Sequence, residues 1–390
     1  MSFRPALSRQ GLMYCILAFP LCLFLSGCTS PPGTLLVFDN LHLIAGSVNT
    51  VEANHPIDIP DAAEQYSLPM TYEFQSEIRE TPKFLTDSGT AGMVIVHKGK
   101  VIYEDYNYGK NRDSLFLLWS VTKSVTSALV GIAIEEGYIN AVTDPVTDYV
   151  PSLANTAYAN STIEDVLEMA SGIKFNETYL PGTDIFWLQL AIGGNLDKHI
   201  QGFKVSDHPS GTFNEYKSSD TQVLGMVLAQ ATGQSLAAYL QTRVWDPAGM
   251  TGNAKWLADR YGREAAWCCL RATVRDMAKF GLIYLNNGFY NNSQIVPEQW
   301  VAASVDTSKP HLQPGDNPQS DDSWGYGYQW WVPDTGNDYS AVGVYNQFIY
   351  VNPDADLVIA KTSGPPDYAE NWREDEHIAF FRAISKQFLD

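Results

Sequence analysis

The most constraining feature of this chain is a long apolar stretch that contains a single charge. The segment 114-SLFLLWSVTKSVTSALVGIAI-134 lies between Asp113 and Glu135, and its only charged side chain is Lys123. Its apolar residues recur at helical spacing and cover nearly the whole circumference, which is typical of a helix buried on all sides. An ammonium group is costly to bury unless it is paired or loses its proton. We therefore expect residues elsewhere in the chain to explain why Lys123 is buried.

The segments around this stretch predict an α+β fold. Two β-rich runs flank 97-HKGK-100 and indicate a hairpin. From about 138 to 300 the chain reads as helices and loops. Then 325–332 alternates like a strand, 345–363 indicates two strands joined by a turn, and a helix is expected over 373–389. We expect one antiparallel sheet formed from both chain ends, flanked by helices, with a mainly helical region inserted.

The first 27 residues have the features of a bacterial export signal. Two arginines precede a short apolar segment that ends in 25-LSGC-28 and is too short for a comfortable membrane span. This ending resembles the lipobox of bacterial lipoproteins, whose cysteine, here Cys28, carries lipid. An ordinary cleaved signal peptide and an uncleaved anchor are the alternatives. Thr29 favours the outer membrane, so we expect residues 1–27 to be removed and the chain to be lipid-anchored in the cell envelope, at the periplasmic face of the outer membrane.

Two further parts of the chain are expected after the signal. Residues 28–75 are rich in proline and weak in periodicity, and are interpreted as a tether with an irregular N-terminal extension. Residues 76–390 are expected to form one domain, with a helical subdomain at about 138–300.

Charge and cysteine content exclude several classes of function. The net charge is −19, from 25 basic and 44 acidic residues, which argues against nucleic acid or an anionic lipid surface as a partner. After Cys28 only the adjacent Cys268 and Cys269 remain. Two buried thiols are expected there, with a vicinal disulfide as the alternative. Neither zinc-site spacing nor an HExxH motif occurs in the sequence, so no metal and no organic cofactor is expected.

The pattern Ser-x-x-Lys, which can supply a nucleophile and its base, occurs twice. Ser171 and Lys174 lie at a helix end beside a glycine, where the lysine can reach solvent. Ser120 and Lys123 lie at the start of the apolar helix, and their spacing puts both on one face. The Ser120 amide would then lie at the positive end of the helix dipole, where an oxyanion is stabilised. A helix cap with a snorkelling lysine is the alternative for this pair.

Tyr216, in 213-FNEYKSSDTQVLG-225, is the next candidate. It precedes a predicted helix whose start has a capping-box pattern, Ser219 with Gln222. A tyrosine at this place can present its hydroxyl to a neighbouring site, and the charge of Lys123 would lower its pKa towards that of a general base. A packing role is the alternative.

These features together resemble the serine β-lactamase-related family, which includes class C β-lactamases, DD-peptidases, family VIII esterases and 6-aminohexanoate-dimer hydrolases. The resemblance covers roughly residues 90 to 390 in the family's order. It is similar above all to the nylon-oligomer hydrolase and esterase-like branch, whose second motif reads Y-x-S. The segments that carry it are 119-WSVTKSVTSALVGIAIEEG-137, 162-TIEDVLEMASG-172, 213-FNEYKSSDTQVLGMVLAQATGQSL-236, 271-RATVRDMAKFGLIYLNNG-288 and 346-NQFIYVNPDADLVIAKTS-363.

The resemblance implies a β-lactamase/transpeptidase-like fold and a role for each motif residue. Ser120 resembles the acylated nucleophile and Lys123 the group that activates it. Tyr216 resembles the general base that passes the proton to the leaving group, and Ser218 a polar partner on the same loop.

The substrate side of the site is implied less completely. The oxyanion hole would consist of the nucleophile's own amide and that of Val344, and Tyr179 resembles a tyrosine that faces the leaving group in the amide hydrolases. The third motif, usually K-T-G or H-x-G, corresponds to 341-AVG-343, with Val342 in place of the cation and Gly343 as its glycine. Lys361, in 361-KTS-363, lies one strand too late to replace that cation.

We expect a serine hydrolase that cleaves a small ester or amide through an acyl-enzyme at Ser120. Without a cation in the third motif, the carboxylate of a β-lactam or of D-Ala-D-Ala should bind poorly. A DD-peptidase acting on peptidoglycan and an inactive binding lipoprotein on the same fold are the alternatives. Four tryptophans could line an apolar pocket or pack in the core: Trp119, Trp187, Trp330 and Trp331.

Overall fold

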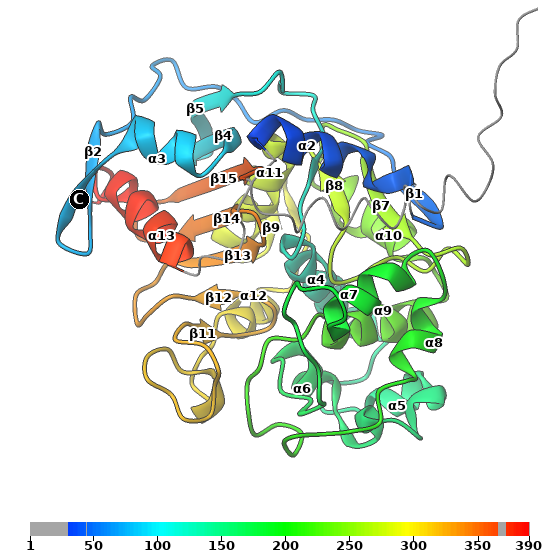
Figure 1. Ribbon diagram of the computed structural model, residues 1–390. Coiled ribbons are helices and arrows are strands. Elements are labelled where there is room, and N and C mark those ends of the chain that lie inside the picture. The colour runs from blue at the N-terminus through cyan, green and yellow to red at the C-terminus, as the bar shows by residue number, and fades with distance from the viewer. Residues whose placement is uncertain (1–29, 44, 366–371, 390) are drawn as a thin grey trace, which may run out of the picture.

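A seven-stranded antiparallel sheet joins segments from both ends of the chain in the computed structural model, which describes residues 30–43, 45–365 and 372–389 (Figure 1). Its strand order is β11-β12-β13-β14-β15-β4-β5. The α+β prediction, with one sheet built from both chain ends, is therefore confirmed. The strands are β4 Thr90–His97, β5 Lys100–Tyr106, β11 Gly325–Tyr326, β12 Trp331–Val332, β13 Tyr339–Gly343, β14 Gln347–Asn352 and β15 Leu357–Ser363.

Two of the predicted turns are confirmed and one predicted strand is wrong. Lys98 and Gly99 both have positive φ, 48° and 71°, as the tight hairpin between β4 and β5 requires. β14 and β15 are joined by the turn expected between them. The segment 325–332 is two short strands and not one, because Gln329 has φ 66° and reverses the chain direction.

Helices cover both faces of the sheet. α13 (Trp372–Ser385) lies on one face, where Phe380 and Phe381 pack in a cluster with Phe348 of β14. α11 (Val274–Leu285) lies on the other face, and a Cβ at its Gly281 would come within 2.5 Å of Val358. A glycine therefore allows the helix to lie directly against the sheet.

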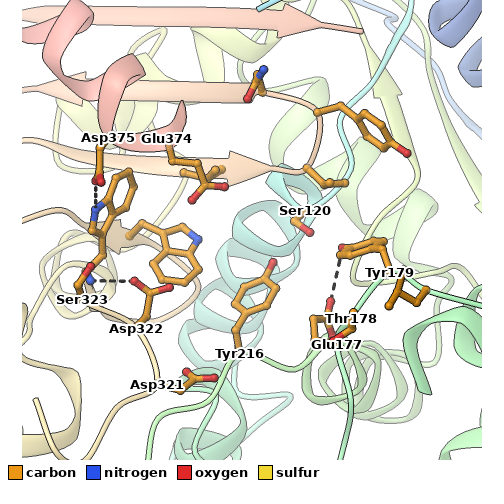
Figure 2. A pocket seen from close by; sticks show the side chains of 17 residues that line it. Ser120, Glu177, Thr178, Tyr179, Tyr216, Asp321, Asp322, Ser323, Glu374 and Asp375 are labelled. Carbon is orange, nitrogen blue, oxygen red and sulfur yellow. Dashed lines mark hydrogen bonds between the residues drawn. The ribbon is translucent and has the colours of Figure 1, made fainter. Parts of the chain in front are cut away.

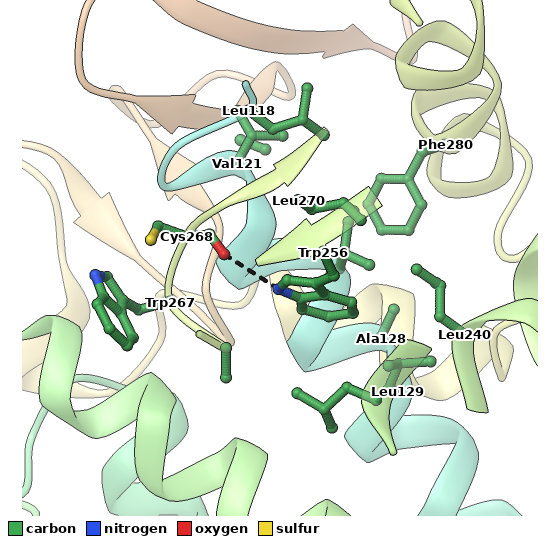
Figure 3. Packing of buried hydrophobic residues seen from close by; sticks show 14 of the residues in the cluster. Leu118, Val121, Ala128, Leu129, Leu240, Trp256, Trp267, Cys268, Leu270 and Phe280 are labelled. Atoms are coloured by element: carbon green, nitrogen blue, oxygen red, sulfur yellow. Dashed lines mark hydrogen bonds between the residues drawn. The ribbon is translucent and has the colours of Figure 1, made fainter. Parts of the chain in front are cut away.

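The apolar stretch forms α4 (Val121–Glu135), which is buried almost throughout, as predicted. Its polar side chains donate to carbonyls of neighbouring segments: Ser124 to Gln329, Ser127 to Tyr328 and Thr126 to Ala266, at 2.6–2.8 Å. Figure 3 shows the apolar core beside this helix, with Ala128 and Leu129 near the indole of Trp256. α4 is thus held by hydrogen bonds to the loops as well as by apolar packing.

The inserted region contains helices and also strands that the sequence did not reveal. A second sheet has the order β1-β7-β8-β6, in which β7 and β8 come from the inserted region and β1 from the N-terminal segment. Its strands are β1 Ser47–Val51, β6 Phe116–Leu117, β7 Ala254–Ala258 and β8 Leu270–Ala272. Two hairpins pair β2 Thr71–Phe74 with β3 Glu77–Glu80 and β9 Phe289–Tyr290 with β10 Ser293–Gln294. The remaining α-helices are α2 Pro31–Asn40, α3 Thr81–Asp87, α5 Val146–Tyr149, α6 Ile163–Leu167, α7 Asp184–Ala191, α8 Leu196–Ile200, α9 Ser218–Thr232, α10 Leu236–Leu240 and α12 Glu298–Ser304.

The N-terminal extension differs from the irregular tether that was expected. α2 contacts β6, and the ring of Phe38 packs edge-on against Trp119 and Tyr345, with centroids 5.2 Å and 4.9 Å away. β1 pairs along its whole length with β7. Such elements are stabilised by partners distant in sequence, which local periodicity does not report. The signal segment and Cys28 lie outside the described residues.

Cys268 and Cys269 are joined by a disulfide, so the expectation of two free thiols is wrong. Both residues are buried, and Cys269 has φ 73°, a backbone conformation that is rare outside glycine. Such a backbone conformation depends on the surrounding fold. Two adjacent cysteines in a sequence therefore do not reveal whether they form a disulfide. In the part of the chain that the structure describes, no single helix could cross a membrane; the bent pair Ser218–Thr232 and Leu236–Trp245 passes that test only when its two helices are joined.

Candidate active site

A cavity of about 790 Å³ lies where the start of α4 meets the sheet and the helical region (Figure 2). It brings together residues from segments far apart in the sequence. Of the residues singled out from the sequence, six line it: Ser120, Tyr179, Tyr216, Trp331, Val342 and Val344. Lys123, Ser218 and Gly343 lie behind this first layer.

Ser120 is the residue directly before α4, and its hydroxyl contacts the side chain of Lys123 in the first turn of that helix. Lys123 Nζ lies 2.8 Å from Ser120 Oγ and 3.1 Å from the carbonyl oxygen of Trp267. Trp119, which precedes the serine, has φ 48°, a strained conformation for an aromatic residue. Strain directly before a nucleophile is typical of a side chain held in a fixed direction for chemistry.

The lone lysine is buried without a direct ion pair. Lys123 is 1% exposed, and burial lowers its pKa from 10.5 to about 7, with the Glu177 carboxylate opposing the shift. A substantial fraction of this side chain is therefore a neutral amine near neutral pH. A neutral amine 2.8 Å from a serine hydroxyl can accept its proton, which a simple snorkelling lysine could not do.

Tyr216 lies in the expected place but does not have the expected pKa. Its ring is 4.7 Å from Lys123 Nζ, yet its pKa is raised well above 10, first by burial and then by charges that include Glu177. A contribution from Ser120 hydrogen bonding opposes the shift. The expected lowering is wrong, because the amine that should cause it loses its own charge on burial. Tyr216 thus keeps its proton near neutral pH, whereas the pKa of Lys123 lies near 7.

Glu177 is a site residue that the sequence reasoning missed. Its carboxylate accepts hydrogen bonds from the Ser218 amide and hydroxyl, at 2.8 and 2.6 Å, and from the Tyr179 hydroxyl at 3.5 Å. Burial raises its pKa, and Lys123 opposes this shift. The only available signal was its place two residues before Tyr179, in 175-FNETY-179.

Ser218 therefore acts through Glu177 and does not line the cavity. Ser218 is the first residue of α9, and Lys217 occupies the N-cap position before it. The capping box expected from Ser219 and Gln222 does not form: the Gln222 side chain instead bonds Ala266 N and Glu264 O.

Gly343 leaves room beside the nucleophile's amide. A Cβ on Gly343 would lie 3.0 Å from Ser120 N and 2.6 Å from Leu118 O, too close for any other residue without a shift. Val344 follows directly on the same loop and lines the cavity beside Ser120. Close approach of the β13 end to Ser120 is what an oxyanion hole formed by these two segments requires.

The cation of the usual third motif has no substitute in the cavity. Val342 occupies that place on β13, paired with Phe348. Lys361 is fully buried on β15, where its ammonium lies 2.5 Å from Ser363 Oγ and 3.0 Å from His377 Nε2, and it does not line the cavity. Among the lining residues whose side chains the structure describes, none is Lys, Arg or His.

The second Ser-x-x-Lys pair lies apart from this site, as expected. Ser171 donates to the buried carboxylate of Asp220 at 2.8 Å, and Lys174 is exposed. Of the four tryptophans, Trp331 lines the cavity, Trp119 and Trp330 pack in the core, and Trp187 is exposed. Trp324 also lines the cavity and was missed.

Four further carboxylates in the cavity wall were not predicted: Asp321, Asp322, Glu374 and Asp375. They come from the loop before β11 and from the first turn of α13, which are about fifty residues apart. Among the described residues no group of three or more His, Cys, Asp or Glu side chains is arranged to hold a metal ion.

Comparison with known proteins agrees with this architecture. The family model described as Beta-lactamase matches residues 78–380. The 6-aminohexanoate-dimer hydrolase of Paenarthrobacter ureafaciens is 29% identical over 300 residues, covering 73% of this chain and 74% of that protein. A solved structure of a candidate 6-aminohexanoate-dimer hydrolase from Bacillus anthracis has a TM-score of 0.81 and 25% identity, covering 92% of this chain and 96% of the other.

A family VIII carboxylesterase is similar in fold alone, with a TM-score of 0.59 and 16% identity over 76% of this chain and 92% of the other. One assignment follows from three observations: the cavity with its serine and lysine, the sheet built from both chain ends, and the family match over most of the sequence. The chain belongs to the beta-lactamase family, and it is similar to 6-aminohexanoate-dimer hydrolases.

Proposed function

We propose that this protein hydrolyses an ester or amide bond of a small molecule other than a classical β-lactam, through an acyl-enzyme on Ser120. The observation that carries the proposal is the 2.8 Å approach of Lys123 Nζ to Ser120 Oγ, together with the low pKa of that buried amine. The hydrolase names of the relatives with 25% identity or more support the same class of reaction.

The first half of the reaction follows from this geometry. Neutral Lys123 accepts the hydroxyl proton as Ser120 Oγ attacks the substrate carbonyl. The oxygen of the tetrahedral intermediate accepts hydrogen bonds from the amides of Ser120 and Val344. Tyr216, whose high pKa keeps it protonated, donates its proton to the leaving alcohol or amine, and regains one from Lys123.

In the second half, water replaces the leaving group. The neutral amine of Lys123 accepts a proton from that water as the water oxygen attacks the acyl carbonyl, and when the intermediate collapses the amine returns this proton to Ser120 Oγ. Tyr179, held by Glu177, lies on the side of the cavity where a leaving group would be bound. No metal or organic cofactor enters these steps.

Substitution of the nucleophile tests the proposal. The wild-type chain should be labelled by a fluorophosphonate probe and should hydrolyse p-nitrophenyl esters, and Ser120→Ala should abolish both. Ser171→Ala, which changes the serine of the second Ser-x-x-Lys pair, is the matched control and should keep the labelling. Persistent labelling of Ser120→Ala would place the nucleophile elsewhere.

The acidic cavity with Val342 gives no support to a DD-peptidase, whose substrate ends in a carboxylate. Ordinary lactamase turnover of nitrocefin would contradict the exclusion of β-lactams.

The location is a separate proposal: lipid on Cys28 would anchor the domain at the periplasmic face of the outer membrane. Fractionation of the wild-type and Cys28→Ala chains between membrane and soluble fractions tests it.

A further inference from the structure

The Cys268–Cys269 disulfide lies directly behind the proposed base. Both cysteines belong to the segment 264–270, which runs beside the first turns of α4 (Figure 3). Lys123 Nζ donates a hydrogen bond to the Trp267 carbonyl in this segment, at 3.1 Å. That carbonyl belongs to the peptide bond that leads into Cys268. The oxygen that holds the amine is therefore attached to the backbone that the disulfide constrains.

The Trp267 carbonyl orients the Lys123 amine. Lys123 is 1% exposed, and within the described ranges its Nζ has two hydrogen-bond partners, the Trp267 oxygen and Ser120 Oγ. A neutral amine can accept the hydroxyl proton only if its single lone pair faces that hydroxyl. Donation of an N–H to the carbonyl fixes the amine so that its lone pair can point at Ser120. If the carbonyl moved, the amine would lose this orientation.

The backbone at the disulfide has a conformation that a free cysteine would not favour. Cys269 has φ 73°, in the left-handed region that a residue with a Cβ rarely adopts. The disulfide closes a small ring that contains the peptide bond between the two cysteines, and this ring restricts the backbone angles of both. The Cys269 carbonyl is fixed separately, because it accepts a hydrogen bond from the Leu257 amide at 3.1 Å. If the ring opened, relaxation of Cys269 would therefore displace the residues before it, which include Trp267.

We propose that Cys268 and Cys269 are positioning residues for the Lys123 base. Their disulfide holds the Trp267 carbonyl in the place where it orients this amine towards Ser120. This inference rests on the proposed hydrolase function and adds a redox-sensitive element to it. A dithiol reductant would break the bond: it gives two electrons and two protons to the sulfurs, leaves two thiols on the chain and is itself oxidised to a cyclic disulfide.

Two double variants remove the disulfide and differ only at position 269. Cys268→Ala with Cys269→Ala, the alanine pair, keeps a Cβ where φ is positive, whereas Cys268→Ala with Cys269→Gly, the glycine pair, allows this φ without steric cost. For p-nitrophenyl butyrate we expect kcat/KM to fall at least about tenfold in the alanine pair, because a catalytic group misplaced by about 1 Å can cost about 10²-fold. The glycine pair should recover part of this loss. Wild-type kcat/KM in the alanine pair, or no recovery in the glycine pair, would overturn the proposal.

The pH profile separates positioning from a general loss of stability. A carbonyl acceptor stabilises the ammonium form more than the neutral amine, so loss of its hydrogen bond should lower the pKa of Lys123 further. In the alanine pair the midpoint of the kcat/KM profile should therefore move to lower pH by about half a unit or more. Thr126→Val, which removes the hydrogen bond from α4 to the neighbouring Ala266 carbonyl, is the matched control. It should lower the thermal midpoint and keep the pH midpoint; an unchanged or raised pH midpoint in the alanine pair would contradict the proposal.

Reduction of the wild-type chain tests the same bond without a substitution. The protein is treated with dithiothreitol, and alkylation of the denatured chain followed by mass spectrometry gives the fraction in which the Cys268–Cys269 bond is broken. We expect kcat/KM to fall in proportion to this fraction. The alanine pair has no such bond and should not respond to dithiothreitol. Full activity of the reduced wild-type chain would refute the proposal.

Nuclear magnetic resonance of lysine amines labelled with nitrogen-15 separates this inference from the proposed function. Titration of Lys123 Nζ, assigned by the loss of its signal in Lys123→Arg, gives the pKa of the amine without any substrate. If esters are not cleaved but the alanine pair lowers this pKa, the hydrolase proposal fails and the positioning role stands. If esters are cleaved and neither this pKa nor kcat/KM changes in the alanine pair, the positioning role is refuted while the hydrolase stands.

Discussion

Burial of the Lys123 ammonium is opposed by desolvation, and within the described part of the chain it is compensated by two hydrogen bonds, to Ser120 and to the Trp267 carbonyl. The compensation is incomplete, and the side chain responds by losing its proton near neutral pH. The unfavourable burial is thus what makes the lysine useful as a base. Tyr216, buried beside it, keeps its proton for the opposite task. In the proposed reaction, these two groups, whose pKa values are moved apart by one environment, supply the base and the acid.

The pH dependence of the reaction should follow Lys123. Because its pKa is lowered to about 7, the amine is neutral and active above that pH and protonated and inactive below it. For a neutral ester, kcat/KM should rise about tenfold per unit of pH up to roughly pH 7 and then level off. Lys123→Arg keeps the charge at all these pH values and should lower kcat/KM by about 10²–10⁴-fold. Lys83→Arg, at an exposed site, is the control; a flat wild-type profile would remove the lysine from the role of base.

Gly343 should be intolerant of even one methyl group. In Gly343→Ala the new Cβ would press on Leu118 O and Ser120 N, and would displace the amide that holds the oxyanion. Loss of one oxyanion donor typically lowers kcat by about 10²-fold, and we expect a fall of that order with little change in KM. Steady-state kinetics on a p-nitrophenyl ester measure it. Gly194→Ala, where the nearest atom is 3.5 Å from the added Cβ, should leave kcat unchanged; equal kcat in both variants would contradict the assignment.

At the scale of elements, what could be predicted followed local pattern, and what could not depended on distant partners. The α4 helix, the β4–β5 hairpin and the β14–β15 pair each carry their periodicity within one segment. β1 and β7 are about two hundred residues apart, and each is too short to be read as a strand until the other lies beside it. Ser120, Lys123 and Tyr216 were found because motif spacing is local. The four carboxylates Asp321, Asp322, Glu374 and Asp375 were missed because the loop before β11 and the first turn of α13 meet only in the folded chain.

The N-terminal helix α2 should contribute to stability, in contrast to a tether. Phe38 is 3% exposed and contacts Trp119, the residue before the nucleophile. Phe38→Ala should destabilise the fold by about 3–5 kcal/mol, as is usual for a buried phenylalanine, and lower the thermal midpoint by several degrees. Leu36→Ala, on the exposed side of the same helix, should change the midpoint little. Equal midpoints for wild type and Phe38→Ala would show that α2 does not pack on the domain in solution.

At the scale of the whole molecule, the charge of the surface and the charge of the cavity have the same sign. The chain carries a net charge of −19, and no lining residue whose side chain the structure describes is basic. A surface potential of one sign concentrates ligands of the opposite sign and repels those of the same sign, and this effect decreases as salt screens it over about 10 Å at 0.1 M. The net charge and the carboxylates of the cavity therefore support the proposed exclusion of anionic substrates.

Anionic substrates should therefore be disfavoured in a manner that salt relieves. We expect p-nitrophenyl hemisuccinate, an anion, to be hydrolysed with a kcat/KM at least about tenfold below that of p-nitrophenyl butyrate at low ionic strength. Added sodium chloride should reduce this difference in kcat/KM, because it screens the repulsion between the anionic ester and the net charge of the protein. The neutral ester experiences no such repulsion, so its kcat/KM should not change with salt. The part of the difference that persists at high salt reports the carboxylates of the cavity, since charges in contact are screened least. An anionic ester that is hydrolysed as fast as the neutral one at low salt would show that neither the surface nor the cavity selects by charge.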